Sequence, residues 1–131
     1  MPRGPIPARF NSLLHSTAVG HLATIGREGT PQVNPVWFIW DGRHLLLSVK
    51  AETLKYRNLR RNPSLAMSIV DPANPHHYLE LRGAVGQFDL YRTLDFVNRL
   101  SRKYTGQPMN PEEDGRERYR LTVEIDSWTG Q

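Results

Sequence analysis

Short apolar runs of strand length dominate residues 18 to 49. AVGHLATI (18–25), PQVNPVWFIW (31–40) and RHLLLSV (43–49) are rich in β-branched, aromatic and other apolar residues. Glycine-bearing segments separate these runs, and the second of them contains the Asp41-Gly42 pair that is typical of tight hairpins. The pattern predicts an antiparallel meander of three strands.

Three further strands are predicted in the rest of the chain. SLAMSIVD (64–71) and HYLELRGAVGQF (77–88) have strand composition, and Gly83 and Gly86 in the second run predict a bulge or a sharp bend. In RYRLTVEID (118–126), apolar residues alternate strictly with polar ones. That alternation indicates a strand with one buried face.

Helical spacing appears in three segments. Residues 9–15 carry apolar residues on one face and would form a lid over the sheet. Residues 53–61 begin with Thr53 in the N-cap position, and Pro63 stops the helix. A third helix is expected after Asp89, where Leu94, Val97, Leu100 and Tyr104 recur at helical spacing. Two loops are expected, at 71–77 and at 104–115.

The order of these elements predicts the fold class. Six strands with helices inserted at intervals, and no alternation of strand and helix, favour an antiparallel barrel over a parallel sheet. We therefore expect one domain over residues 1–131, mostly β with helical decoration, as a six-stranded antiparallel split β-barrel. Strands 31–40 and 64–71 carry apolar residues on both faces, so either a helix or a second subunit must cover their outer faces.

Composition narrows the class of protein. The chain has 131 residues, of which 38% are hydrophobic and 23% charged, so it can bury a core and is unlike a disordered chain. The longest apolar runs fall far short of the roughly 20 residues of a membrane-spanning helix. With no cysteine and no apolar stretch after Arg3 in the N-terminal segment, we expect a cytoplasmic protein without disulfides.

Charge and motifs leave few kinds of chemistry open. The net charge of +4 permits a nucleic acid, an anionic cofactor or no anionic partner. The sequence contains no nucleophile elbow and no phosphate-binding P-loop. It also has no pair of carboxylates at a spacing that would indicate catalysis. Of the five histidines, only His76 and His77 are adjacent, and neighbouring residues of an extended chain point to opposite faces, so we expect no metal site.

The junction between the third strand and the second helix, SVKAETLKYRNLRRNP (48–63), is a candidate anion site. The first turn of a helix offers unpaired amide hydrogens and a partial positive charge, and Thr53, Lys55 and the Ser48 hydroxyl would lie beside it. On a helical projection Arg57, Arg60 and Arg61 share one side of the helix, whereas Lys55 points elsewhere. The alternative is an ordinary amphipathic helix with a solvated basic face.

Here the sequence resembles a known family. AVGHLATIGREGTPQVNPVWFIWDGRHLLLSVKAETLKYRNLRRNPSLAMSIVD (18–71), followed by HYLELRGAV, RKYTG and RYRLTVEI, is similar to the split-barrel flavin and deazaflavin binding proteins related to pyridoxamine 5′-phosphate oxidase. The likeness is closest to the branch that uses coenzyme F420. It implies a homodimer in which the cofactor lies in a groove between the subunits.

The resemblance also implies a set of cofactor-binding residues. The strand-to-helix junction would hold the phosphate, and the ring would lie along the second strand. Tyr78 of the opposite subunit and Trp128 would complete the pocket. The implied phosphate-binding residues are Ser48, Val49, Lys50, Thr53, Lys55 and Asn58, and the implied ring-binding residues are Gln32, Val33, Asn34, Pro35 and Val36.

One departure favours F420 over FMN. Relatives that use FMN usually have an arginine on the second strand and an arginine-lysine pair at the junction, where this sequence has Pro35 or Val36 and Leu54-Lys55. A doubly charged FMN phosphate would meet fewer cations here, whereas the phosphodiester of F420 needs fewer and its glutamyl tail could meet Arg57, Arg60 or Arg61.

The expected function is an F420H2-dependent reductase that transfers a hydride from the deazaflavin to a small conjugated organic substrate. In such an enzyme the cofactor performs the chemistry, and the protein supplies position, exclusion of water and electrostatics. The alternatives are an FMN-binding protein of the oxidase type, a non-catalytic flavin or F420 carrier or sensor, and a nucleic-acid binder. A nucleic-acid binder gains little from a barrel without exposed aromatic residues on a basic face.

Overall fold

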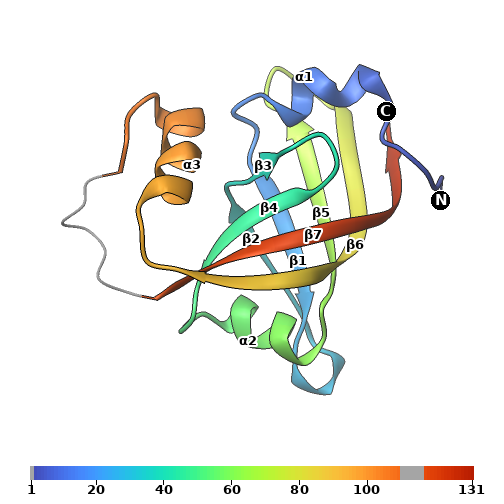
Figure 1. Ribbon diagram of the computed structural model, residues 1–131. Helices are drawn as coiled ribbons and strands as arrows, with labels where there is room; N and C mark the ends of the chain where they lie inside the picture. Colours follow the sequence, from blue (N-terminus) through green and yellow to red (C-terminus); the bar gives the residue numbers. More distant parts are fainter. Residues whose placement is uncertain (1, 110–116) are drawn as a thin grey trace.

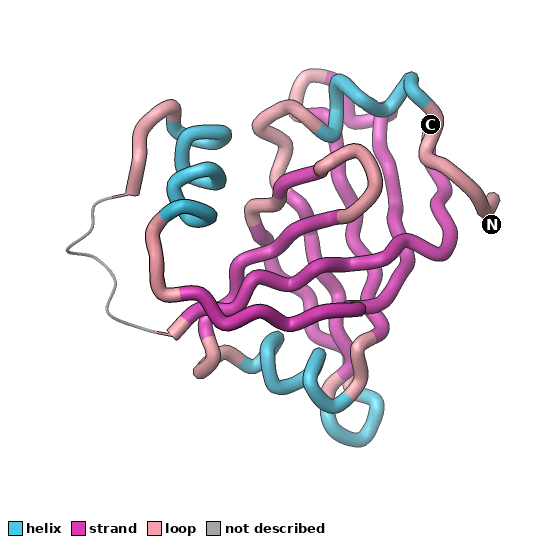
Figure 2. The backbone as a smooth tube through the Cα atoms, viewed as in Figure 1, coloured by secondary structure: helices cyan, strands magenta, loops and turns pink. Residues whose placement is uncertain are grey.

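The protein folds around a single antiparallel sheet, as a computed structural model of residues 2–109 and 117–131 shows. Seven strands follow one another across the sheet in the order β2-β1-β5-β6-β7-β4-β3, and Figures 1 and 2 show that the sheet is strongly curled. The strands are β1 (Gly20–Ile25), β2 (Pro31–Val36), β3 (Ile39–Trp40), β4 (Leu45–Lys50), β5 (Ser64–Asp71), β6 (Asn74–Tyr91) and β7 (Arg118–Gly130).

The prediction of six strands was wrong because the predicted strand 31–40 divides into β2 and β3. These two strands lie at opposite edges of the sheet, yet only Trp37 and Phe38 separate them. Three residue steps span at most about 11 Å, so the two edges must approach each other. The sheet is therefore a split barrel, and the predicted fold class is confirmed.

Phe38 shows why the strand is interrupted. Its side chain is fully buried in the core, and its backbone N–H donates to the Tyr104 hydroxyl at 3.3 Å. The side chain of such a residue turns into the barrel, and its backbone N–H bonds to a side chain instead of to a neighbouring strand. It therefore cannot continue a flat strand. The sequence pattern contained no sign of this, because the partner lies 66 positions away.

The long strands β6 and β7 extend beyond their predicted bounds. The expected loop at 71–77 is a tight turn, so His76 and His77 lie in β6. The predicted bulge is confirmed by register shifts between Arg82 and Gly83 and between Val85 and Gln87. A Cβ atom on Gly83 would lie 2.0 Å from the Glu124 carbonyl oxygen, so only glycine allows the two strands to approach here.

Helices close the ends of the barrel, as Figure 1 shows. The predicted lid is confirmed as the 3₁₀ turn η1 (Ala8–Phe10) followed by α1 (Asn11–Leu14), which bury Phe10, Leu13 and Leu14. Helix α2 (Leu54–Arg61) lies at the opposite end, and α3 (Asp95–Thr105) lies beside the sheet. The start of α3 falls later than predicted, because β6 continues to Tyr91.

The core fills the inside of the curled sheet. Leu22, Leu47, Leu81 and Leu121, from four different strands, are at most 1% exposed. The predicted alternation of the last strand is confirmed, since Leu121 and Val123 are fully buried while Arg120 and Thr122 are half-buried and Glu124 is exposed. None of the described helices is long and apolar enough to cross a bilayer.

Candidate functional site

A cavity of about 380 Å³ lies where the end of β2, the start of α2 and α3 meet. We call it the strand–helix pocket. Its lining residues fall into two groups by chemistry. We call the polar and charged group, Ser48, Lys55 and Arg118, the cationic end, and the apolar group, which comes mainly from α3, the end of β2 and the β2–β3 link, the apolar end. The apolar end consists of Val19, Pro35, Val36, Trp37, Val97, Leu100 and Met109.

Strand alternation and strand pairing build the cationic end. Ser48 and Lys50 share the outer face of β4, whereas Val49 between them points into the core and is 1% exposed. Pairing of β4 with β7 places Arg118 opposite Lys50. The Arg118 guanidinium then donates to the Ser48 hydroxyl at 3.4 Å, and the Tyr91 hydroxyl makes a short hydrogen bond with the same oxygen.

Lys55 is an unusual cation. Burial lowers the pKa of its ammonium group, and the charge of nearby Lys50 lowers it further. Both effects penalise the charged form of the ammonium group. A negative group in the pocket would offset that penalty by its attraction to Lys55.

Helix α2 begins as predicted. The Thr53 hydroxyl accepts a hydrogen bond from the Tyr56 amide at 3.4 Å and donates to the Lys50 carbonyl at 2.8 Å. The Thr53 hydroxyl therefore already donates its single proton within the cap. The amides of Leu54 and Lys55, which have no acceptor inside the helix, are the first-turn donors that could face an anion.

One ring stack and two hydrogen-bonded groups hold the wall formed by α3. Trp37 stacks on Tyr104 with ring centroids 5.0 Å apart, and the Tyr104 hydroxyl donates to the Ala18 carbonyl. The Lys103 ammonium donates to the Leu14 and Phe38 carbonyls at 3.1 and 2.8 Å. Burial lowers the pKa of Lys103 to about 8 and raises the pKa of Tyr104 to about 12.

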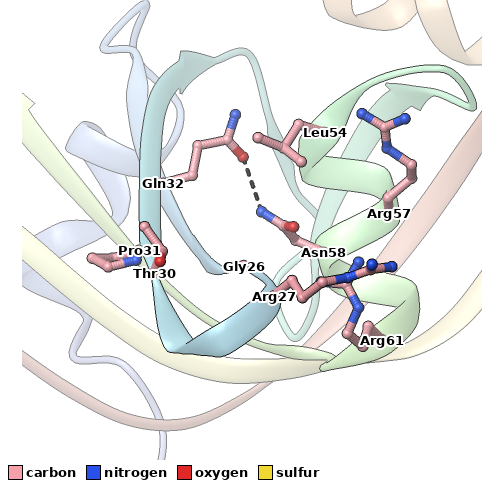
Figure 3. A pocket seen from close by; sticks show the side chains of 9 residues that line it. All are labelled: Gly26, Arg27, Thr30, Pro31, Gln32, Leu54, Arg57, Asn58 and Arg61. Carbon is pink, nitrogen blue, oxygen red and sulfur yellow. Dashed lines mark hydrogen bonds between the residues drawn. The ribbon is translucent and has the colours of Figure 1, made fainter.

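A second cavity, of about 520 Å³, lies on the other side of α2 (Figure 3). Arg57 and Arg61 reach it from α2, and Arg27 reaches it from η2 (Arg27–Gly29), the turn between β1 and β2. None of the three forms an ion pair with another described residue. We call this cavity the arginine groove, and its remaining lining residues are Gly26, Thr30, Pro31, Gln32, Leu54 and Asn58.

The floor of the arginine groove is a buried polar network. The fully buried Asn58 donates to the Thr24 hydroxyl at 3.0 Å and to the Gln32 side-chain oxygen at 3.2 Å. Its own side-chain oxygen has no hydrogen-bond partner. This network ties α2 to β1 and β2.

The predicted grouping of Arg57, Arg60 and Arg61 is wrong for Arg60. Its Nε donates to the Tyr56 hydroxyl at 2.7 Å, and its guanidinium lies 4.1 Å from the centroid of the Phe88 ring. Arg60 therefore holds α2 against β6 through contacts with aromatic side chains. The third arginine that lines the groove is Arg27.

The structure distributes the other predicted site residues over several places. Pro35 and Val36 line the strand–helix pocket, and Gln32 lines the arginine groove. Val33 is 65% exposed on the outer face, while Asn34 buries a side-chain oxygen without a partner. Tyr78, which pairs with Gln131, and Trp128, which packs on Phe10, line neither cavity of this chain. The same holds for five other predicted residues: Val33, Asn34, Val49, Lys50 and Thr53.

Sequence reasoning missed Arg118, Tyr91 and the α3 residues Val97 and Leu100. Arg118 and Tyr91 reach Ser48 only through the pairing of distant strands, which no local pattern reveals. Arg118 of β7 also adds a second cation to the lining of the strand–helix pocket, which the sequence argument for F420 did not count. The predicted loop at 104–115 lies partly outside the described residues.

Comparison with known proteins gives the chain its relatives. Residues 6–128 match the family model described as pyridoxamine 5′-phosphate oxidase. A solved structure named F420 reductase is 40% identical, with a TM-score of 0.89 over 96% of this chain and 100% of that one.

More distant structures share the fold alone. HupZ of group A Streptococcus is 12% identical, with a TM-score of 0.70 over 95% of this chain and 93% of that one. General stress protein 26 of Bacillus anthracis is 14% identical, with a TM-score of 0.68 over 93% and 90%. Because the family model spans nearly the whole chain, this protein belongs to the pyridoxamine 5′-phosphate oxidase family.

Proposed function

We propose that the protein is an F420H2-dependent reductase that binds the deazaflavin in the strand–helix pocket. The observation that carries this proposal is the pocket's division into a cationic and an apolar end. An apolar end suits an aromatic ring system, and Ser48, Lys55 and the first turn of α2 suit a phosphate. The 40% identity to a protein named F420 reductase supports the same cofactor.

The bound cofactor would supply the hydride for reduction of a small conjugated organic substrate. The residues of this chain bind and orient it. Pro35 and Val36 offer a surface along the end of β2, and Trp37, fixed against Tyr104, excludes water from the apolar end. Lys55 and Ser48 hold the phosphate and so fix where the ring lies.

The arginine groove extends the proposed site for F420. Gln32 at the start of β2 lines the groove, and Pro35 at the end of β2 lines the strand–helix pocket, so both cavities follow the same strand. A cofactor with an anionic tail could extend from one cavity into the other. We assign the glutamyl tail to the groove, where Arg27, Arg57 and Arg61 would meet its carboxylates.

The proposed active unit is a homodimer. The outer face of β2, β1 and β5 exposes Val33 at 65% and Ile25 and Val70 at 37% each, and none of them belongs to the described apolar clusters. A second copy of the chain would cover this face, as the sequence pattern and the family resemblance led us to expect. Tyr78 lies across from Val70 in the β5–β6 pair, at a position from which it would reach the partner's pocket.

FMN binding is the second candidate, and Arg118 favours it. With Lys55 and Arg118 at one end of the pocket, a doubly charged phosphate meets two cations rather than one. A carrier or sensor would bind the same cofactors without turnover. In each case we expect the protein to act in the cytoplasm.

The test is to mix the purified protein with F420 and with FMN and to measure binding by fluorescence. We expect a clear preference for F420 and a loss of about 10- to 100-fold in Lys55→Ala, because a charge-assisted contact is removed. Arg43→Ala, in the exposed β3–β4 turn, serves as the control. Tight binding of FMN alone would assign the protein to the oxidase type, and bound F420H2 that no acceptor oxidises would indicate a carrier.

A further inference from the structure

Helix α3 packs beside the curled sheet through an apolar cluster of its own. Its Phe96 and Leu100 side chains form this cluster with Leu46 of β4, and Ile39 and Tyr91 pack against it. Among the described residues, the larger cluster that fills the barrel contains no side chain of α3. Figure 1 shows the helix outside the barrel accordingly. Movement of α3 would therefore expose the small cluster and leave the core intact.

Two neighbouring polar side chains, Lys103 and Tyr104, hold the C-terminal end of α3, and we call them the latch. The Lys103 ammonium donates to the carbonyls of Leu14 and Phe38 at 3.1 and 2.8 Å. The Tyr104 hydroxyl donates to the Ala18 carbonyl at 3.0 Å and accepts from the Phe38 N–H at 3.3 Å. The latch thus joins α3 to the end of α1, to the segment before β1 and to the β2–β3 link.

The latch provides the β2–β3 link with hydrogen-bond partners from outside the sheet. Phe38 is fully buried and belongs to neither β2 nor β3, and both its backbone N–H and its carbonyl bond to the latch. A buried backbone group without a partner is costly, so the link and the latch stabilise each other. The Lys103 ammonium also lies 3.8 Å from the centroid of the Phe38 ring. The position of the link therefore depends on α3.

The two segments that the latch joins also form much of the apolar end of the strand–helix pocket. Val97 and Leu100 line the pocket from α3, and Trp37 lines it from the β2–β3 link. Met109 lines it as well, and its backbone N–H donates to the Asn98 side chain of α3 at 3.0 Å. Met109 is thus attached to the helix. Release of the latch would free these segments together and widen the pocket.

The latch is suited to opening without unfolding of the protein. Both of its side chains are only half-buried, so water can replace their hydrogen bonds. We propose that α3 is a lid over the strand–helix pocket, fastened by Lys103 and Tyr104 and hinged at residues 92–94, which belong to no strand or helix. The identity of the compound that enters the pocket rests on the proposed function, whereas the lid does not.

Native-state hydrogen exchange of the ligand-free protein tests the lid. A lid opens while the core stays folded, so the α3 amides should exchange at lower free energy than those of β1 and β5, and with little dependence on urea at low concentration. Lys103→Met and Tyr104→Phe should raise the α3 rates about 5- to 30-fold, because each removes hydrogen bonds of the closed form. If α3 exchanges with the same free energy and urea dependence as the core, or if both variants leave its rates unchanged, the lid is wrong.

The matched control is Arg102→Met. Arg102 is the exposed basic neighbour of Lys103 on the same helix and takes no part in the latch bonds. Its loss should change the α3 exchange rates about threefold at most, since an exposed cation near a helix C-terminus contributes little. An increase as large as that of Lys103→Met would show that any loss of charge loosens α3, and it would refute the latch.

Cofactor-binding kinetics separate the lid from the proposed function. If a ligand enters only when the lid is open, both latch variants should raise the association rate constant of F420 or FMN by about the factor seen in α3 exchange. Stopped-flow fluorescence measures this rate constant. A rise in the dissociation rate constant alone would show that the latch only shapes the pocket, and the lid would be wrong. If neither cofactor binds while α3 exchanges as expected, the proposed function fails and the lid stands.

Discussion

The strand–helix pocket and the arginine groove share helix α2 but hold their cations in different ways. In the pocket, Lys55 is half-buried and burial lowers its pKa, so its charge is costly until an anion arrives. In the groove, Arg57 and Arg61 extend from the helix surface, and the buried group is the neutral Asn58 below them. From this difference we expect strong binding of a single anionic group in the pocket and weaker, additive contacts in the groove.

The largest expected effect is on the free energy of unfolding. It comes from the buried network at the floor of the groove rather than from the arginines at its rim. Asn58→Ala should lower the free energy of unfolding by about 2–3 kcal/mol, because the buried Thr24 hydroxyl and the Gln32 side-chain oxygen lose a donor and keep only the bond between them. Urea denaturation measures this. The control is Asn62→Ala, which removes an exposed contact to the Ser64 amide and should cost no more than about 1 kcal/mol. Equal losses of unfolding free energy in Asn58→Ala and Asn62→Ala would show that the buried network stabilises this region no more than the exposed contact does.

A smaller effect is expected at the rim of the groove. The double variant Arg27→Gln, Arg57→Gln should weaken F420 with a long glutamyl tail about three- to tenfold, because exposed ion pairs each contribute less than about 1 kcal/mol. The loss should shrink at high ionic strength, since salt screens exposed charges. Fluorescence titration of short- and long-tailed F420 measures both effects.

Arg60→Gln is the control for the groove. The Arg60 guanidinium is engaged with Tyr56 and Phe88 rather than with the cavity, so the dependence on tail length should stay as in the wild type. A loss as large as in the double variant would place the tail on the other side of α2.

The smallest effect concerns α3, which walls the pocket and not the groove. The pKa of Lys103 is lowered to about 8 in the folded protein, so between pH 8 and the ordinary lysine pKa of 10.5 the unfolded chain binds more protons. Stability should therefore rise with pH from about 8. Tyr104, whose pKa is raised to about 12, ionises first in the unfolded chain and reverses the trend above its ordinary pKa of 10.

Urea midpoints between pH 7 and 10 measure this dependence, and Lys103→Met is the matched variant because it keeps the length of the side chain without the charge. Its midpoint should vary less with pH over that range. An unchanged slope would show that the ammonium group is no better solvated in the unfolded chain.

Some of the site followed from sequence because its physics is local. The Thr53 cap and the bounds of α2 depend on neighbouring residues, and Lys55 follows from that helix by position. The alternation in the last strand and the glycine bulge in β6 also depend on short-range geometry. The family resemblance added the expected roles of β2 and of the strand-to-helix junction, and it favoured F420 with FMN as the alternative.

By itself, the sequence determined the strand-rich fold class and the helix that Thr53 caps, because hydrophobic period, capping and turn chemistry act over a few residues. It also predicted an anion site beside that cap. Only the tertiary structure decided that β2 and β3 lie at opposite edges, that Arg118 and Tyr91 reach Ser48, and that Arg27 rather than Arg60 joins the groove. These contacts join residues far apart in the chain. Their positions depend on how the sheet pairs and curls, which no local pattern specifies.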